Sequence, residues 1–265
     1  MTSLFALAAP EVSVAPEKLF NIGPFGVTNS HMLGLLGGII ILAIMFGTVR
    51  ALKRGSRGRL MHMVLWAFES LYDTTVEVIG DKHVARKVMP LAVTLLFFFL
   101  INNWLGILPF VGSVTYGHHP LFRGAAADMN MTFALAIISM ATAQIWAIRR
   151  QGFFGNAKRY LVSPLKDPLH SFEGILEIIA EFSRTLALSL RIFGNVFGGE
   201  VLLGVIAYLS GYAAGIALPL FYVLELFVGA VQAYVFFMLT VAFISLGLPN
   251  GENAHADAAE AKEAK

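Results

Sequence analysis

The sequence predicts an all-α integral membrane protein with about five membrane-embedded helices and one amphipathic helix at the membrane interface. Of its 265 residues, 57% are hydrophobic and only 14% are charged, and the mean hydropathy is +0.72. A soluble globular domain carries about 25% charged residues. The net charge of +2 is too small to indicate nucleic-acid binding, and the absence of cysteine excludes disulfides and thiolate metal sites.

The first part of the chain predicts a leader, a span and an interfacial helix. Residues 1–30 contain three prolines, and we expect an irregular leader on the outer side of the membrane. The run 32–49 is apolar and uncharged, and at 1.5 Å per residue it is just long enough to cross roughly 30 Å of hydrocarbon. Five basic residues follow within 50–59 and mark the inner side. The segment 60–79 places acidic and apolar side chains on different faces, which predicts an amphipathic interfacial helix.

Two further spans are predicted at about 89–112 and 129–148, and Pro90 suits the first turn of the earlier one. The distribution of basic residues gives the orientation. Two of them, Lys18 and Arg123, lie in predicted outer segments, whereas thirteen lie in predicted inner segments, at 50–59, 82–87 and 149–166. This asymmetry predicts an outer N-terminus and an inner C-terminus.

The last two apolar segments, 171–210 and 211–248, are too long for upright spans. Forty helical residues measure about 60 Å, which is about twice the hydrocarbon thickness. We therefore expect a long, strongly tilted helical hairpin. Residues 31–248 are expected to form a single membrane domain, and the Ala-, Glu- and Lys-rich tail 249–265 is expected to be disordered and cytoplasmic.

Arg191 stands in the middle of the first of these long apolar segments. An arginine near the bilayer centre costs roughly 2.5–3.5 kcal/mol on insertion scales, so a function is expected for it. At about 100° per residue, the polar residues of this helix drift along one stripe: Glu173, Glu177, Glu181, Arg184, Arg191 and Asn195. Glu200 lies about half a turn round from Arg191, so the arginine is not simply neutralised by that glutamate.

Ionisable groups buried in a membrane usually mark ion pathways, and Arg191, Glu200 and Glu225 therefore favour a proton or ion route. Structural alternatives remain for the other polar residues. Arg184 lies nearer the cytoplasmic end and three residues after Glu181, so one alternative for it is an interfacial ion pair. Glu173 and Glu181 would serve equally well as a solvated entrance. Gln232 and Asn103 would serve as hydrogen bonds between helices.

Two other functions remain open. In a stand-alone secondary transporter, Arg191 would bind an anionic substrate, but such transporters usually contain repeated halves, and none is evident. A membrane-embedded hydrolase or transferase would use His118, His119 or Asp128, but the chain lacks a motif such as HExxH or GxSxG. The two histidines have no third ligand at a suitable spacing, so no metal site is expected.

Four motifs resemble the a subunit of the F-type ATP synthase. They are SLRIFGNVFGGE at 189–200, VQAYVF at 231–236, NNWLGILP at 102–109 and DMNMT at 128–132. Together they cover roughly residues 89–246 in the order of the family, whereas the first 88 residues are similar only in hydropathy and in the basic loop. The resemblance implies a stator beside a rotating ring of c subunits, with two offset aqueous half-channels for protons.

The resemblance also implies roles for single residues. Arg191 matches the essential arginine of the family, which faces the ring carboxylate and stands between the half-channels. A guanidinium stays charged in proteins, so it cannot itself relay protons. The outer half-channel is matched by Glu200, Glu225, Asn195, Gln232 and Asn103, and the inner one by Glu173 and Glu177. This chain has glutamate at both 200 and 225, where relatives often have one histidine, and a close pair would share a proton. Glu200 is expected to point towards Glu225.

Further implications of the resemblance concern partners and location. Peripheral-stalk b subunits and the remainder of the ATP synthase complex are implied, with no cofactor and no metal, and the chain would not be catalytic by itself. We expect the bacterial inner (plasma) membrane, with the mitochondrial inner membrane as the alternative. Protons are favoured over sodium as the coupling ion.

Overall fold

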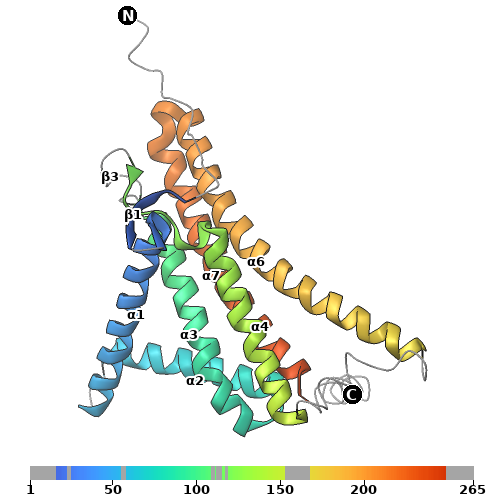
Figure 1. Cartoon of the computed structure of the whole chain (residues 1–265). Helices are drawn as coiled ribbons and strands as arrows, with labels where there is room; N and C mark the ends of the chain where they lie inside the picture. The colour runs from blue at the N-terminus through green and yellow to red at the C-terminus, as the bar shows by residue number, and fades with distance from the viewer. Residues whose placement is uncertain are drawn as a thin grey trace, which may run out of the picture. The chain divides into compact units, whose positions relative to one another are not determined.

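The computed structural model describes residues 16–22, 25–54, 58–108, 111, 115–116, 119–152 and 168–248. In this part of the chain the six α-helices are α1 (Asn29–Lys53), α2 (Arg59–Ile79), α3 (Lys82–Ile107), α4 (Met129–Gln151), α6 (Pro168–Ser210) and α7 (Ala214–Leu246) (Figure 1). All except α2 are long and apolar enough to cross a membrane. The predicted class is therefore confirmed. The predicted disordered tail 249–265 lies outside the described residues.

Short strands occur before α1 and before α4. Strands β1 (Lys18–Ile22) and β2 (Phe25–Thr28) pair antiparallel, and β3 (Thr115–Tyr116) pairs with β4 (His119–Pro120). The expectation of an irregular leader is wrong for β1 and β2, because the prolines near them precede or separate the strands and do not interrupt either one.

Helix α3 begins seven residues before the predicted span, so the expectation of Pro90 in a first turn is wrong. Pro90 lies inside the helix, where it removes one backbone hydrogen bond. The helix starts early because Asp81 caps it: its Oδ1 accepts hydrogen bonds from the backbone N–H of His83 at 2.7 Å and of Val84 at 3.4 Å. A hydropathy window detects only the apolar part of such a helix.

The two long helices agree with the predicted lengths. Helix α6 has 43 residues and is drawn as one continuous helix in Figure 1. At 1.5 Å per residue it is about 65 Å long. The connection to the 33-residue α7 is the 3₁₀ turn η2 (Gly211–Ala213). Gly211 has a φ of 49°, which favours glycine. The strong tilt of this hairpin stays a prediction.

The chain forms two compact units. The first unit contains residues 1–45, 97–132 and 190–234, and the second contains 46–96, 133–189 and 235–265. Each of the five long apolar helices contributes residues to both units. A single membrane domain over 31–248 stays a prediction.

Each unit has its own packed interior. In the first unit, Leu33 and Phe99 are buried, and the 3₁₀ helix η1 (Ala125–Ala127) is buried throughout. In the second unit, the Ser139 hydroxyl donates a 2.8 Å hydrogen bond to Thr240, which joins α4 to α7 in the interior. Small and hydroxyl-bearing residues of this kind are common where membrane helices approach closely.

Asp81 gives the second unit an acid-sensitive contact. Its Oδ2 lies 2.8 Å from Nη2 of Arg150 at the end of α4. The backbone hydrogen bond from His83 holds the pKa of Asp81 below its ordinary value of 3.8, and Arg150 lowers it further. Because the pKa is lower in the folded state, the ionised carboxylate stabilises the fold above about pH 3.8, and this contribution is lost as the pH falls through the folded pKa.

We therefore expect Asp81→Asn to reduce the acid sensitivity of the fold slightly. Asparagine still caps a helix, so this variant removes the charge and keeps the cap. Thermal unfolding of the detergent-solubilised protein, followed from neutral pH to below about pH 3.8, should show a smaller loss of Tm in the variant than in the parent. The same loss in both proteins would contradict the role given to the ionised carboxylate.

Candidate functional site

Helix α6 has two different faces in the first unit. Ile192 and Val196 are buried at 0% and 8% exposure, whereas Arg191 is exposed. A Cβ added at Gly194 or Gly198 would meet no atom of the described chain within 4 Å. Among the described residues Arg191 makes no ion pair or hydrogen bond. The guanidinium therefore projects from an open, glycine-containing face of a helix that is otherwise apolar.

Glu225 of α7 lies against the buried side of α6. Its side chain is only 6% exposed, and a Cβ added at Gly199 would overlap its carboxylate. Glycine is thus required at 199 for this close approach of a carboxylate to a helix backbone. An acid buried at a helix contact in this way is rare in apolar helices and usually functional.

Helix α7 carries a buried polar stripe. Glu225, Gly229 and Gln232 are spaced four and three residues apart, and all three are buried. Asn103 of α3 lies against Gly229, where an added Cβ would overlap its amide. Trp104 Nε1 donates a 3.2 Å hydrogen bond to the carbonyl oxygen of Leu226, which fixes α3 against α7. The structure thus brings Asn103 onto the stripe that bears Glu225 and Gln232.

Several amide atoms near this stripe are unsatisfied. Asn103 is 1% exposed, and neither its Oδ1 nor its Nδ2 has a hydrogen-bond partner among the described residues. The same holds for Nε2 of the buried Gln232 and for Nδ2 of the half-buried Asn195 on α6. Buried polar atoms normally find a protein or water partner, so groups of this kind favour contact with water.

Glu200 forms an ion pair with Arg123, a residue that the sequence places in a loop with no predicted role in the site. Oε2 of Glu200 lies 3.7 Å from Nε of Arg123, and their side chains are 43% and 8% exposed. The segment bearing Arg123 lies close to α3 and α6. A Cβ added at Gly106 would lie 3.0 Å from Cα of Gly124, and one added at Gly124 would lie 3.9 Å from Cγ1 of Val196. The feature of the sequence that could have indicated a role for Arg123 is that it is the single Lys or Arg of the loop 113–128.

The proton-sharing pair of Glu200 and Glu225 stays a prediction. Glu225 lies against Gly199, whereas Glu200 forms an ion pair with Arg123. The expectation that Arg191 does not neutralise Glu200 agrees with this geometry.

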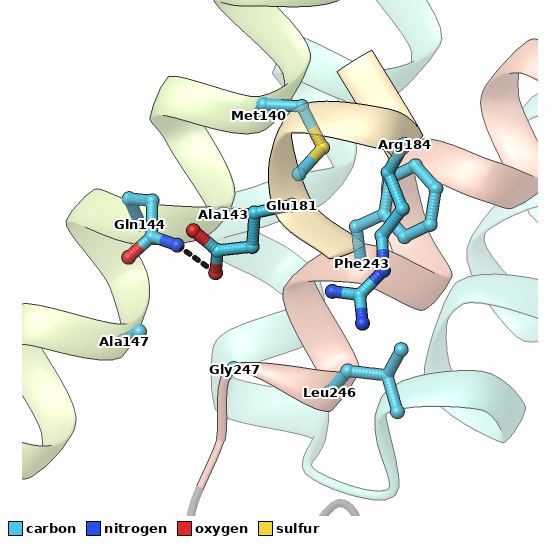
Figure 2. A pocket seen from close by; sticks show the side chains of 9 residues that line it. All are labelled: Met140, Ala143, Gln144, Ala147, Glu181, Arg184, Phe243, Leu246 and Gly247. Carbon is cyan, nitrogen blue, oxygen red and sulfur yellow. Dashed lines mark hydrogen bonds between the residues drawn. The ribbon is translucent and has the colours of Figure 1, made fainter. Parts of the chain in front are cut away.

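The second unit contains another cluster of polar side chains, around the earlier part of α6 (Figure 2). Arg184 Nη2 lies 3.6 Å from Oε1 of Glu177, so its ion pair is with the glutamate seven residues before it, and not with Glu181 as the sequence suggests. Its guanidinium carbon lies 6.0 Å from the ring centroid of Phe243. Gln144 of α4 donates a hydrogen bond to Glu181. Glu173 belongs to α6, but its side chain lies outside the described residues.

The residues proposed for a hydrolase do not assemble into a described site. His118 lies outside the described residues, and so does the side chain of His119. Asp128 is 2% exposed and caps α4, since its Oδ1 accepts a 2.9 Å hydrogen bond from the backbone N–H of Asn130. This geometry gives Asp128 a structural role.

Long apolar helices that carry a projecting guanidinium and a buried carboxyl group are typical of membrane proteins that move ions. Residues 31–245 match the model of the family described as "ATP synthase A chain". The chain therefore belongs to the ATP synthase subunit a family, whose members are proton-translocating subunits of the membrane sector.

Bacterial relatives named ATP synthase subunit a support this membership. The Bacillus subtilis (strain 168) protein is 31% identical over 237 residues, which cover 83% of this chain and 91% of the relative. The Mycobacterium tuberculosis (strain CDC 1551 / Oshkosh) protein is 30% identical over 232 residues, with 86% and 90% covered. The Mycobacterium leprae (strain TN) protein is 35% identical over 173 residues, with 65% and 67% covered. These relatives and the five apolar helices point to the bacterial plasma membrane.

The contact of Glu225 with Gly199 can be tested by adding a methyl group. We expect Gly199→Ala to destabilise the protein by about 1–3 kcal/mol, as overpacking typically does, because the carboxylate of Glu225 must move. Gly215→Ala on α7 is the matched control, since a Cβ there would meet no described atom within 4 Å and alanine favours a helix. Thermal unfolding in detergent checks both variants. Equal Tm values for the two would contradict the close approach.

Proposed function

We propose that this chain is the stator that leads protons to and from a rotating ring of c subunits through two half-channels kept apart by Arg191. The observation that carries the proposal is the exposed Arg191 on an open face of α6, without a partner among the described residues of its own chain. A charge in hydrocarbon needs a countercharge, so this guanidinium requires an acid from another chain.

The carboxylate of a c subunit fits this requirement. The guanidinium of Arg191 stabilises the ionised form of a nearby carboxylate, and it stays charged throughout. Gly194 and Gly198, which flank it on the same helix, leave room for a second helix to approach closely. Arg191 therefore attracts each ring carboxylate in turn and blocks a direct leak between the half-channels, because it does not release a proton.

The polar groups of the first unit suit the outer half-channel. Glu200 is 43% exposed and Glu225 is 6% exposed, so one acid is open to its surroundings and the other is buried. The unsatisfied amides of Asn103, Gln232 and Asn195 supply donors and acceptors for ordered water. Arg123 holds Glu200 in place, so we add it to this route.

For the inner half-channel we propose Glu173 and Glu177. Both lie on the earlier part of α6, which the distribution of Lys and Arg places towards the cytoplasm. The ion pair of Glu177 with Arg184 places a partly exposed carboxylate and guanidinium on this part of the helix.

Proton flow drives rotation because a ring carboxylate must be neutral before it turns into lipid. It takes a proton from the outer half-channel, travels round the ring and releases the proton when it returns to Arg191 from the inner side. A proton that crosses 100 mV supplies about 2.3 kcal/mol. Several protons in sequence would thus provide the energy for ATP synthesis, which the remainder of the complex carries out.

The proposed partners follow from this mechanism. They are the c-subunit ring, the peripheral-stalk b subunits that hold the stator still, and the remainder of the ATP synthase complex. The N-terminus would lie outside and the C-terminus in the cytoplasm, and protons would be the coupling ion. A stand-alone secondary transporter would instead move an anionic substrate as a purified single chain. Isolation without a c ring would favour that alternative.

Replacing Arg191 tests the central role. We expect Arg191→Ala to abolish ATP-driven proton pumping in inside-out membrane vesicles and to leave at most a passive leak, because the ring carboxylate loses its countercharge. Arg54→Ala, at an exposed arginine in the inner basic cluster after α1, is the matched control and should pump normally. Undiminished pumping by Arg191→Ala in assembled complexes would refute the role.

The acids of the outer route provide a second test. A positioned proton donor or acceptor contributes at least about a hundred-fold to a rate. We expect Glu225→Gln and Glu200→Gln each to slow proton flow by roughly ten- to a hundred-fold, because water takes over part of the role of the lost carboxyl group. Arg123→Gln should slow it less, since Glu200 remains. Initial pumping rates across a range of pH measure the effect. Unchanged flux in both glutamate variants at every pH would exclude the assigned half-channel.

A further inference from the structure

Three helices of the second unit line a small, partly open cavity that contains polar and apolar side chains (Figure 2). Gln144 of α4 and Glu181 and Arg184 of α6 supply its polar lining, and Phe243 of α7 supplies part of the apolar lining. The cavity also touches Gly247, directly after the end of α7. It therefore lies near the ends of α4 and α7, which the basic residues place on the cytoplasmic side.

The size of the cavity suits one water molecule. The volume within the cavity that the centre of a water-sized sphere can occupy is about 10 Å³. A cavity needs at least about 10–15 Å³ of this volume to hold one water molecule. Such a water also needs two to four polar partners. The amide of Gln144, the carboxylate of Glu181 and the guanidinium of Arg184 provide them.

Arg184 and the two glutamates near this cavity do not form a single isolated ion pair. Arg184 lies 3.6 Å from Glu177, whereas Glu181 accepts a hydrogen bond from the neutral amide of Gln144. Two carboxylates thus stand beside one cation. A glutamine side chain can donate to a carboxylate through its NH₂ group or accept from a carboxylic acid through its carbonyl oxygen. Gln144 is therefore able to hold Glu181 in both protonation states.

We propose that Glu181 is a proton-carrying residue of the inner route, that Gln144 positions it, and that the cavity holds the water that joins it to the cytoplasmic side. This inference rests on the proposed function. The proton moves from a hydronium ion at the cavity to a carboxylate oxygen of Glu181, which gives water and a neutral carboxyl group. Release of the proton towards the ring restores the carboxylate, and during ATP synthesis the same steps run in reverse.

The competing explanation is that the hydrogen bond between Gln144 and Glu181 only joins α4 to α6, as amides often do between membrane helices. Glu181→Gln separates the two explanations, because a glutamine at 181 can still accept the hydrogen bond from Gln144 but cannot carry a proton. A structural role therefore predicts little change in this variant. A proton-carrying role predicts a loss of flux.

The experiment uses inside-out vesicles that contain the whole complex, with flux normalised to the amount of assembled complex. We expect Glu181→Gln to lower ATP-driven proton pumping several-fold. The exchanged double variant Glu181→Gln, Gln144→Glu returns a carboxylate to the cavity from α4 and should recover most of the lost rate. Glu77→Gln, which neutralises an exposed acid of α2 in the same unit, should pump at the parental rate.

Two results would overturn the inference. One is parental flux in Glu181→Gln, and the other is an assembled double variant that recovers none of the lost rate. If Glu181→Gln does not assemble, Glu181→Asp keeps a carboxylate and should assemble and pump; a several-fold loss in that variant would count against a proton-carrying role. Arg191→Ala is measured in parallel, because it tests the proposed stator function separately from the role of Glu181. Normal pumping there would refute the stator role, whereas normal pumping in Glu181→Gln alone would refute only this step.

Discussion

A permanently charged guanidinium in hydrocarbon is the constraint on which the rest of this structure depends. Its insertion costs at least roughly 2.5–3.5 kcal/mol, and Arg191 projects from the exposed face of α6. Two other polar groups of the first unit, Glu225 and Asn103, are buried between helices. Glu225 lies against Gly199, and Asn103 lies against Gly229, so glycine backbones make room for polar side chains between the helices. Arg191 has no such arrangement among the described residues of its own chain, and this is why we propose a partner for it from another chain.

The acids of the two units are held in different ways, and the difference suits two routes with different surroundings. In the first unit, Glu200 pairs with the buried Arg123, which comes from the loop before α4. In the second unit, Arg184 pairs with Glu177 on its own helix, and a neutral amide holds Glu181. An ion pair favours the charged carboxylate, whereas an amide can hold either protonation state.

The spans could be predicted from the sequence because apolar length and clusters of basic residues are properties of the chain itself. Helix α4 was expected at 129–148 and occupies Met129–Gln151. The early start of α3 was missed, since its first residues are not apolar and depend on the cap at Asp81. The burial of Arg123 was missed because it involves contacts with α6, whose Glu200 lies far along the chain. Spacing on a helix predicts a stripe of polar residues, but it does not give their partners: Arg184 pairs within α6, whereas Glu181 accepts a hydrogen bond from Gln144 of α4.

The most direct test of the stator role is to identify what covers α6 beside Arg191. Leu190 precedes the arginine and is 48% exposed, so a photoreactive amino acid at this position samples the same surroundings. Irradiation of intact membranes, followed by mass spectrometry of the cross-linked product, names the neighbour. Capture of the c subunit is the predicted result. Cross-links to lipid alone, or only to other parts of this chain, in a complex that pumps protons, would contradict it.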